Sequence, residues 1–216
     1  YEIYQCDWSS DVCSSDLFVS VWHSRPDGLS DAGAGQDGWG GGIYMQQFDA
    51  SGHAVGVETL VNTGFTAFDR LYPSVTTLTD GSYVVTWQSL FQDGDFWGVE
   101  GQHYAANGTA IGSSFQVNTT TANQQILPSV TGEPDSGFVV TWSSYGQDNA
   151  DGSAGVYAQQ FDANGNKIGA EVQVDDYTPG DQSDSAVTYL ANNGYAVAYD
   201  SYLQDGSGYG IALRFF

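Results

Sequence analysis

Short stretches in which apolar and polar residues alternate run along most of the chain, separated by turn signals. Residues 73–78 (PSVTTL) alternate, Thr79-Asp80-Gly81-Ser82 interrupts them, and residues 83–88 (YVVTWQ) follow, dense in β-branched and aromatic side chains. Asp-Gly between two such runs is a strong β-hairpin signal, and the density of the second run predicts a strand that packs on both faces. No apolar periodicity of 3.6 residues extends far enough to predict a helix.

Two further strands complete this unit. Residues 98–104 predict a third strand, Ala106-Asn107-Gly108-Thr109 predicts a turn, and residues 114–118 predict a closing strand. Four antiparallel strands in about 50 residues is the size of one blade of a β-propeller of the longer, kelch-like kind.

The unit recurs at a nearly constant spacing along the chain. Gln36-Asp37-Gly38 returns as Gln92-Asp93-Gly94, as Gln147-Asp148 and as Gln204-Asp205-Gly206, at spacings of 56, 55 and 57 residues. An aromatic residue precedes each motif at a matching position: Trp22, Trp87, Trp142 and Tyr199. Self-similarity at a fixed period indicates an array of one supersecondary unit.

We therefore predict an all-β protein built from four-stranded antiparallel blades at a ~56-residue repeat. The partial or complete units span residues 18–63, 72–119, 127–176 and 184–216. Because the first unit lacks its opening strand and the last its closing strand, we expect an open arc or a fragment of a β-propeller from a longer parent chain. A string of small β-sandwiches, each made of two repeats, is the alternative architecture.

Residues 1–17 have no counterpart in the repeats. Their tail, DVCSSDL, is similar to the translation of a sequencing-adapter oligonucleotide, so we interpret this segment as non-native and assign one repeat domain to residues 18–216. The two cysteines, Cys6 and Cys13, both lie in the segment. The repeats therefore offer neither a disulfide framework nor a cysteine metal site.

The repeat region is strongly acidic. Four of the 26 acidic residues fall in the first 17 positions, which leaves 22 acids against four bases and a formal charge of −18. Such an excess disfavours nucleic acid and anionic membranes as partners, and no apolar run reaches the ~20 residues of a membrane-spanning helix. Aromatic residues make up 14% of the chain, which is too many for a disordered acidic segment.

The sequence motifs of the repeat resemble those of tandem repeats in large secreted bacterial proteins. The third unit carries it most fully, in Pro128-Ser129-Val130, Gly137 to Trp142, Gln147-Asp148, and Val156 to Gly165. The resemblance covers nearly everything from Phe18 onward. It implies an adhesin-like or calcium-dependent exported protein that is extracellular or on the cell surface, with glycans or surface proteins as partners.

The Gln-Asp-Gly loops are the candidate metal sites. Their carboxylates lie two or three residues apart on glycine-rich loops, and Ca²⁺ takes six to eight oxygen ligands from such segments. The candidate ligands are Asp37, Asp93, Asp95, Asp148, Asp151 and Asp205. The alternative is purely structural: aspartate closes a turn through its own backbone, and glycine supplies a positive φ.

Two tryptophans are candidate ligand-binding residues. Trp39 and Trp97 follow the Gln-Asp motif in the first two units and are missing from the third, so they could stack on a sugar ring beside the carboxylates. The recurring Trp22, Trp87 and Trp142 are expected in the core instead. Glu100 stands at the repeat position that Tyr44 and Tyr157 occupy in other units, so it is the one acid that clearly breaks the repeat pattern.

Two functions fit these observations. Nearly every polar residue of interest recurs with the repeat, as structural residues do, so the sequence favours a non-enzymatic scaffold or adhesion segment with weak calcium binding and no catalytic residues. The alternative is a carbohydrate-binding or glycoside-cleaving β-propeller, with Trp39 and Trp97 as stacking platforms.

Overall fold

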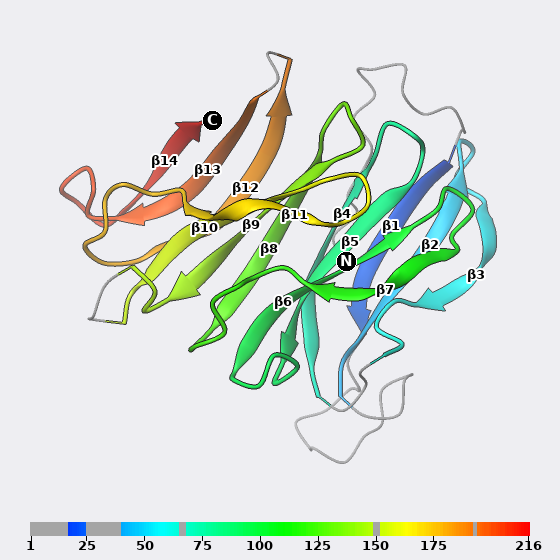
Figure 1. Cartoon of the computed structure of the whole chain (residues 1–216), viewed down its shortest axis with the longest axis horizontal. Coiled ribbons are helices and arrows are strands. Elements are labelled where there is room, and N and C mark those ends of the chain that lie inside the picture. The colour runs from blue at the N-terminus through cyan, green and yellow to red at the C-terminus, as the bar shows by residue number, and fades with distance from the viewer. Residues whose placement is uncertain (1–16, 25–39, 65–67, 149–151, 192–193) are drawn as a thin grey trace.

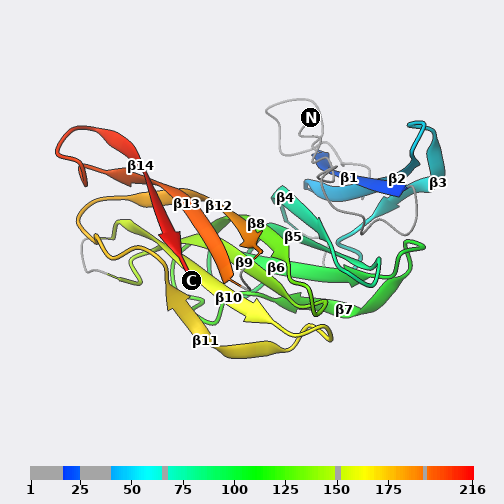
Figure 2. The same cartoon turned by 90° about the horizontal axis from the view of Figure 1, so that it is seen from above.

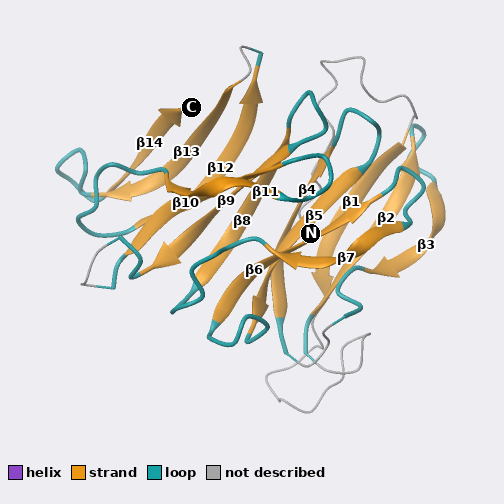
Figure 3. Cartoon of the chain, in the orientation of Figure 1, coloured by secondary structure: helices purple, strands orange, loops and turns teal. Residues whose placement is uncertain are grey.

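In the computed structural model, the described residues are 17–24, 40–64, 68–148, 152–191 and 194–216, and every regular element among them is a β-strand (Figure 3). No helix in these ranges could therefore cross a membrane. The strands are β1 (Leu17–Ser24), β2 (Gly42–Asp49), β3 (Ala54–Leu60), β4 (Arg70–Thr77), β5 (Tyr83–Leu90), β6 (Trp97–Tyr104), β7 (Ala110–Gln116), β8 (Gln125–Gly132), β9 (Phe138–Tyr145), β10 (Ala154–Phe161), β11 (Lys167–Gln173), β12 (Gln182–Leu190), β13 (Gly194–Tyr202) and β14 (Tyr209–Phe215). Of the predicted non-native segment, only Leu17 lies in a described range, at the start of β1.

These strands form four antiparallel sheets, one for each repeat. The sheets are β1-β2-β3, β4-β5-β6-β7, β8-β9-β10-β11 and β12-β13-β14, each in chain order, and we call them sheets A to D. Figure 2 shows them following one another as successive blades, and Figure 1 shows the strand order within each. The predicted all-β architecture of propeller blades is confirmed.

Both faces of the inner sheets are buried, because consecutive valines point in opposite directions. Val85 packs into the core between sheets A and B, and its neighbour Val84 packs into the core between sheets B and C. Val140 and Val139 divide in the same way between the B–C core and the C–D core. A string of separate sandwiches would bury only one face of each sheet, so that alternative is wrong.

The innermost strands of neighbouring sheets are joined by side-chain hydroxyls. The Ser74 hydroxyl accepts a hydrogen bond from the backbone N–H of Val130 at 3.3 Å, and that of Thr76 accepts one from Gly132 at 3.0 Å. Ser129 and Thr131 repeat these contacts toward β12, accepting from Val187 at 3.3 Å and Tyr189 at 3.2 Å. The Pro-Ser-Val motif thus places β4, β8 and β12 side by side.

In every sheet a stacked aromatic pair joins the second and third strands of the repeat unit, which in sheet A are β1 and β2. The ring centroids lie between 4.8 and 5.2 Å apart, and the ring planes differ by 7° to 13°. The pairs are Phe18–Phe48, Tyr83–Tyr104, Phe138–Phe161 and Tyr195–Phe216. These pairs explain why aromatic residues recur at fixed offsets in the sequence.

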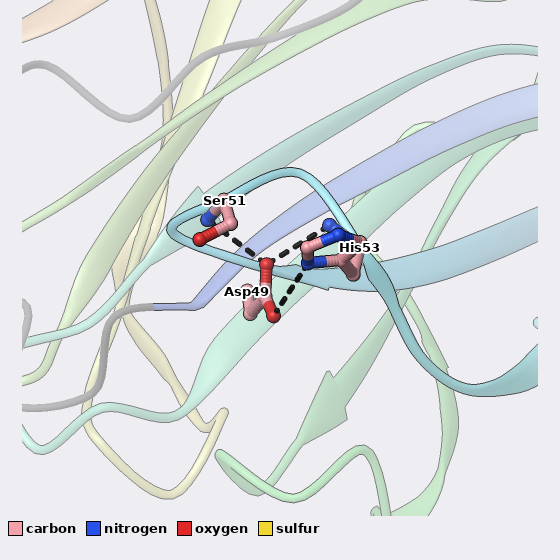
Figure 4. A network of polar contacts seen from close by, with 3 residues as sticks. All are labelled: Asp49, Ser51 and His53. Carbon is pink, nitrogen blue, oxygen red and sulfur yellow. Dashed lines mark hydrogen bonds and ion pairs between the residues drawn. The ribbon is translucent and has the colours of Figure 1, made fainter.

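In sheets A and C, the turn between the third and fourth strands of the repeat unit is closed by an aspartate. In sheet A the Asp49 carboxylate accepts the backbone N–H groups of Ser51 and His53, each at 2.9 Å, and lies 3.3 Å from the His53 ring (Figure 4). The hydrogen bond from the His53 backbone holds the pKa of Asp49 below its usual value. Asp162 closes the equivalent turn of sheet C through Asn164 and Asn166. We call this end of the molecule the turn edge.

Candidate functional site

The opposite end of the sheets, which we call the loop edge, carries the longer connections. There the loops between second and third strands, such as residues 91–96 and 203–208, lie with the connections between sheets, such as residues 117–124 and 174–181. Antiparallel order requires this division, because the hairpins joining first to second and third to fourth strands must lie together at the turn edge.

The Gln-Asp motif of the loop edge makes structural contacts. The Ser89 hydroxyl donates to the Gln92 side chain at 2.8 Å, and Ser144 donates to Gln147 at 2.7 Å. The Asp93 carboxylate accepts a hydrogen bond from the Asn118 amide at 3.3 Å. These contacts tie the loop to the second strand of its sheet and to the connection that follows the fourth.

Four of the six candidate calcium ligands lie in the described parts of the chain. Asp37 and Asp151 lie outside the described residues, as does Trp39. Asp95 accepts the backbone N–H of Asn123 at 2.9 Å, and Asp205 accepts that of Ser207 at 3.0 Å. Among the described residues, no three acids, histidines or cysteines gather in a group that could hold a metal ion. Calcium binding stays a prediction.

Glu100 lies away from solvent, within β6. It is only 4% exposed, and its Cα partner in β5 is Trp87, a core residue. The pKa of Glu100 is raised to about 7, chiefly by burial and also by the negative charge of Asp93, while Lys167 opposes the shift. The acid that breaks the repeat pattern is therefore one that is buried among core residues.

The first strands of sheets B, C and D share an irregularity near the loop edge. In each sheet the register of the first strand against the second shifts within a few residues. A residue other than glycine adopts a positive φ at that point. The three are Tyr72 (φ 51°), Leu127 (φ 57°) and Asp184 (φ 51°), and they occupy equivalent repeat positions. Such bulges turn a side chain away from its normal direction and are frequent beside active sites.

The preceding sheet supports each bulge. The Leu127 N–H donates to the Gln88 side chain at 3.0 Å, and the Asp184 N–H donates to the Ser143 hydroxyl at 3.2 Å. The His23 ring packs against the Tyr72 ring, with centroids 6.1 Å apart. The bulged residues are thus held in place rather than free to relax.

Asp184 and Asp200 form a pair of carboxylates at this irregularity in sheet D. Ser183, the neighbour of Asp184, is the Cα partner of Asp200 on β13. Burial raises the pKa of the Asp184 carboxyl, and the negative charge of Asp200 raises it further. Asp184 nevertheless remains exposed to solvent, so a ligand can reach it.

An aromatic patch lies on the loop edge of sheet B. It consists of Phe68, Phe91 and Phe96, which are 43%, 43% and 51% exposed. The Phe68 and Phe91 rings meet edge to face at 5.3 Å, and the Phe91 and Phe96 centroids are 6.1 Å apart. Trp97, a predicted stacking residue, follows Phe96 directly and begins β6. Exposed rings gathered in this way are suited to stacking on sugar rings.

Sequence reasoning missed Asp184, Asp200 and the three phenylalanines. The signal that could have found them is deviation from the repeat: Asp184 replaces Tyr72 and Leu127, and Phe91 stands where the other units have Gly146 and Leu203. The attention given to recurring acids pointed to structural residues instead.

No protein-family model matches the chain, and no curated protein matches it. Several solved structures share its fold. An α-L-arabinofuranosidase from Fusarium graminearum matches with a TM-score of 0.57 and 13% identity over 90% of this chain and 59% of its own. An N-acetylgalactosamine deacetylase from F. plautii matches with a TM-score of 0.57 and 14% identity over 94% and 70%. A xylan β-1,4-xylosidase from Bacillus halodurans matches with a TM-score of 0.52 and 11% identity over 93% and 39%. The chain thus spans less than two thirds of the arabinofuranosidase and of the xylosidase.

This likeness contradicts two expectations drawn from the sequence. The interpretation as a non-enzymatic scaffold or adhesion segment is wrong, and so is the expectation of a protein without enzymatic activity, because the structures that share the fold are carbohydrate-active enzymes. The error lay in weighing the recurring polar residues. They recur because every blade needs them, and they say nothing of the residues that differ between blades.

Proposed function

We propose that this protein binds a carbohydrate chain on its loop edge and cleaves glycosidic bonds there. The observation that carries the proposal is that Asp200, which lies opposite Ser183 on β13, acts electrostatically on the exposed Asp184 at the bulge of β12. Glycoside cleavage requires two carboxyl groups about 5 to 10 Å apart, one protonated and one ionised. The similar arabinofuranosidase and xylosidase support this choice of reaction.

The two carboxyl groups have different roles in this proposal. Asp184 carries the raised pKa, so it holds a proton near neutral pH more readily than an ordinary aspartate and donates it to the leaving oxygen. Asp200 acts as the base that activates water or as the nucleophile. The Asp184 N–H bond to Ser143 fixes the backbone from which the acid acts.

The aromatic patch extends the site along the loop edge. Phe68, Phe91 and Phe96 supply exposed ring faces on which sugars of a chain can stack. Arg70, the nearest cation in sequence to this patch, is fully buried, and Lys167 is engaged with Asn118 and Thr119. With a formal charge of −18 from Phe18 onward, the protein repels anionic chains. We therefore propose neutral polysaccharides as the substrate class.

A panel of polysaccharides tests this function. The protein is incubated with neutral chains such as arabinan and xylan and with anionic chains such as pectate, and new reducing ends are measured over time. We expect release from at least one neutral chain and none from the anionic chains. No release from any neutral chain would overturn the proposal, and release from the anionic chains alone would overturn the substrate class.

A further inference from the structure

One asparagine side chain joins the segments that meet between sheets B and C. Asn118 follows β7, and its side-chain oxygen accepts the Val99 N–H at 2.8 Å. Its amide nitrogen donates to three oxygens, which are the Asp93 carboxylate at 3.3 Å, the Thr120 carbonyl at 2.8 Å and the Gln125 side chain at 3.2 Å. We call Asn118 with these three oxygens the amide hub. A donor at its centre serves every acceptor around it.

An aspartate takes the central place between sheets C and D. Asp175 follows β11, and its Oδ1 accepts the Val156 N–H at 2.6 Å, just as Asn118 accepts that of Val99. The other carboxylate oxygen of Asp175 therefore stands where Asn118 has its amide nitrogen. A donor between sheets B and C has become an acceptor between sheets C and D.

The surrounding oxygens of the hub are retained at this second place. Their residues stand at the equivalent repeat positions: Asp148, Tyr177 and Gln182. The Gln173 amide nitrogen lies 3.4 Å from the Asp148 carboxylate and 2.9 Å from that of Asp175, and donates to both. Asp175 is only 3% exposed. Two carboxylates thus lie close together in a place that is largely removed from water, where negative charge is costly unless it is compensated.

The Gln182 side chain adds an unmatched acceptor to this place. Gln182 is fully buried, and its side-chain oxygen has no hydrogen-bond partner in the described parts of the chain. Its amide nitrogen donates to the Pro179 carbonyl at 3.3 Å. Gln125 makes the same kind of bond in the hub and turns its oxygen toward the central side chain, so the Gln182 oxygen faces Asp175. Turning the Gln182 amide over would set its oxygen against the Pro179 carbonyl, so neither orientation removes the conflict.

A cation resolves the conflict, because the groups that face one another are all oxygen acceptors. Ca²⁺ takes six to eight oxygens from carboxylates, side-chain amides, backbone carbonyls and water, so two acids are enough when neutral oxygens complete the set. Oxygens that share a Ca²⁺ lie roughly 3 Å apart. The contacts of the hub, at 2.8 to 3.3 Å, have this spacing. Mg²⁺ demands a stricter octahedron and gives up its water reluctantly, so it suits the place less well.

We propose that the Asp148 and Asp175 carboxylates, the Tyr177 carbonyl and the Gln182 side-chain oxygen form a Ca²⁺ site between sheets C and D. Of the loop acids that the sequence pattern singles out, only Asp148 belongs to it. The other ligands come from the connection between the sheets and from the start of β12. The ion joins sheets C and D as the amide of Asn118 joins sheets B and C. The site does not depend on the proposed glycoside cleavage.

Calcium titrations of the full-length protein test the site. After treatment with a chelator, isothermal titration calorimetry should show one Ca²⁺ per chain, with a Kd of about 10⁻⁴ to 10⁻³ M. Calcium chloride at about 10 mM should raise Tm by about 3 °C or more. Magnesium chloride at the same concentration, and sodium chloride at the same ionic strength, should raise it less. No Ca²⁺ binding, or an equal rise with all three salts, would overturn the proposal.

Three variants locate the ion. Asp175→Asn rebuilds the amide hub, so it should lose Ca²⁺ binding and, without calcium, have a higher Tm than the wild type. Asp148→Asn should also lose binding, whereas the matched Asp93→Asn, at the equivalent position in sheet B, should bind Ca²⁺ as the wild type does. If Asp175→Asn keeps the ion, or Asp93→Asn loses it too, the proposed ligands are wrong. A wild type that calcium leaves unchanged but that Asp175→Asn stabilises would show that a proton occupies the place, and would equally overturn the proposal.

Discussion

The Asp148 carboxylate lies where a β-carbon on Gly155 would have to be, with its Cγ and Oδ2 both 2.9 Å from that ideal position. Asp205 stands in the same relation to Gly210, at 3.1 Å, and Asp93 lies against Gly98 in the same way. The aspartate of the Gln-Asp motif and the glycine in the third strand are therefore a packing pair. The glycine is needed there because it has no side chain, and the aspartate fills the space.

A Gly155→Ala variant should consequently be less stable. The added methyl group displaces the Asp148 carboxylate or shifts β10, and overpacking of this kind costs about 1 to 3 kcal/mol. Urea unfolding monitored by tryptophan fluorescence measures the loss. The double variant Gly155→Ala with Asp148→Ala should recover part of it, because the clash is gone. A single variant as stable as the wild type would show that the space is not filled as the structure has it.

Glu100 should make stability fall as pH rises. Its pKa is about 7 in the folded protein, above the ordinary value of 4.5. Between these values the folded state holds a proton that the unfolded state has lost, so the free energy of unfolding decreases from about pH 4.5 to pH 7 and then levels off. The loss amounts to about 3 kcal/mol in order of magnitude.

The Glu100→Gln variant isolates this effect from the other acids. Its free energy of unfolding, compared with that of the wild type, should improve between about pH 4.5 and pH 7 and then stay constant up to pH 8 in urea titrations. Glu58→Gln, a change at an exposed glutamate, serves as the control and should leave the pH profile unchanged. Parallel wild-type and Glu100→Gln profiles would contradict the burial of a protonated Glu100.

The aromatic patch should contribute to carbohydrate binding. Replacing both Phe91 and Phe96 by alanine removes two exposed rings, and each stacking contact contributes about 0.5 to 1.5 kcal/mol. Affinity for the neutral polysaccharide that the protein cleaves should therefore fall about tenfold or more, measured by affinity electrophoresis. Phe215→Ala removes a ring on β14 that is more exposed than either of these and should leave the affinity unchanged. An equal loss of affinity in Phe215→Ala would contradict a specific role of the aromatic patch.

The blades could be predicted from the sequence because each recurring residue has a recurring contact. Asn118 recurs as a motif since its side chain caps the Val99 N–H, and the paired valines Val84 and Val85 recur since each enters a different core. Local patterns of this kind are sufficient to specify sheets and turns.

The candidate site could not be predicted in the same way. Asp184 and Asp200 are 16 residues apart in the sequence, and only the register of β12 against β13, which sets Asp200 opposite Ser183, brings them near each other. Phe68 and Phe91 belong to different connections and meet only because both lie on the loop edge. A site that depends on departures from a repeat needs the register of the strands, which the repeat alone does not define.

Activity of the two aspartate variants tests the central claim most directly. On the neutral polysaccharide that the wild type cleaves, Asp184→Asn and Asp200→Asn should each lower kcat about 10² to 10⁴-fold, the usual contribution of a catalytic acid or base. KM should change little, and Asp205→Asn, at an exposed loop aspartate, should retain wild-type activity. If Asp184→Asn and Asp200→Asn both keep wild-type kcat, or if Asp205→Asn loses as much as they do, the pair is not the catalytic centre.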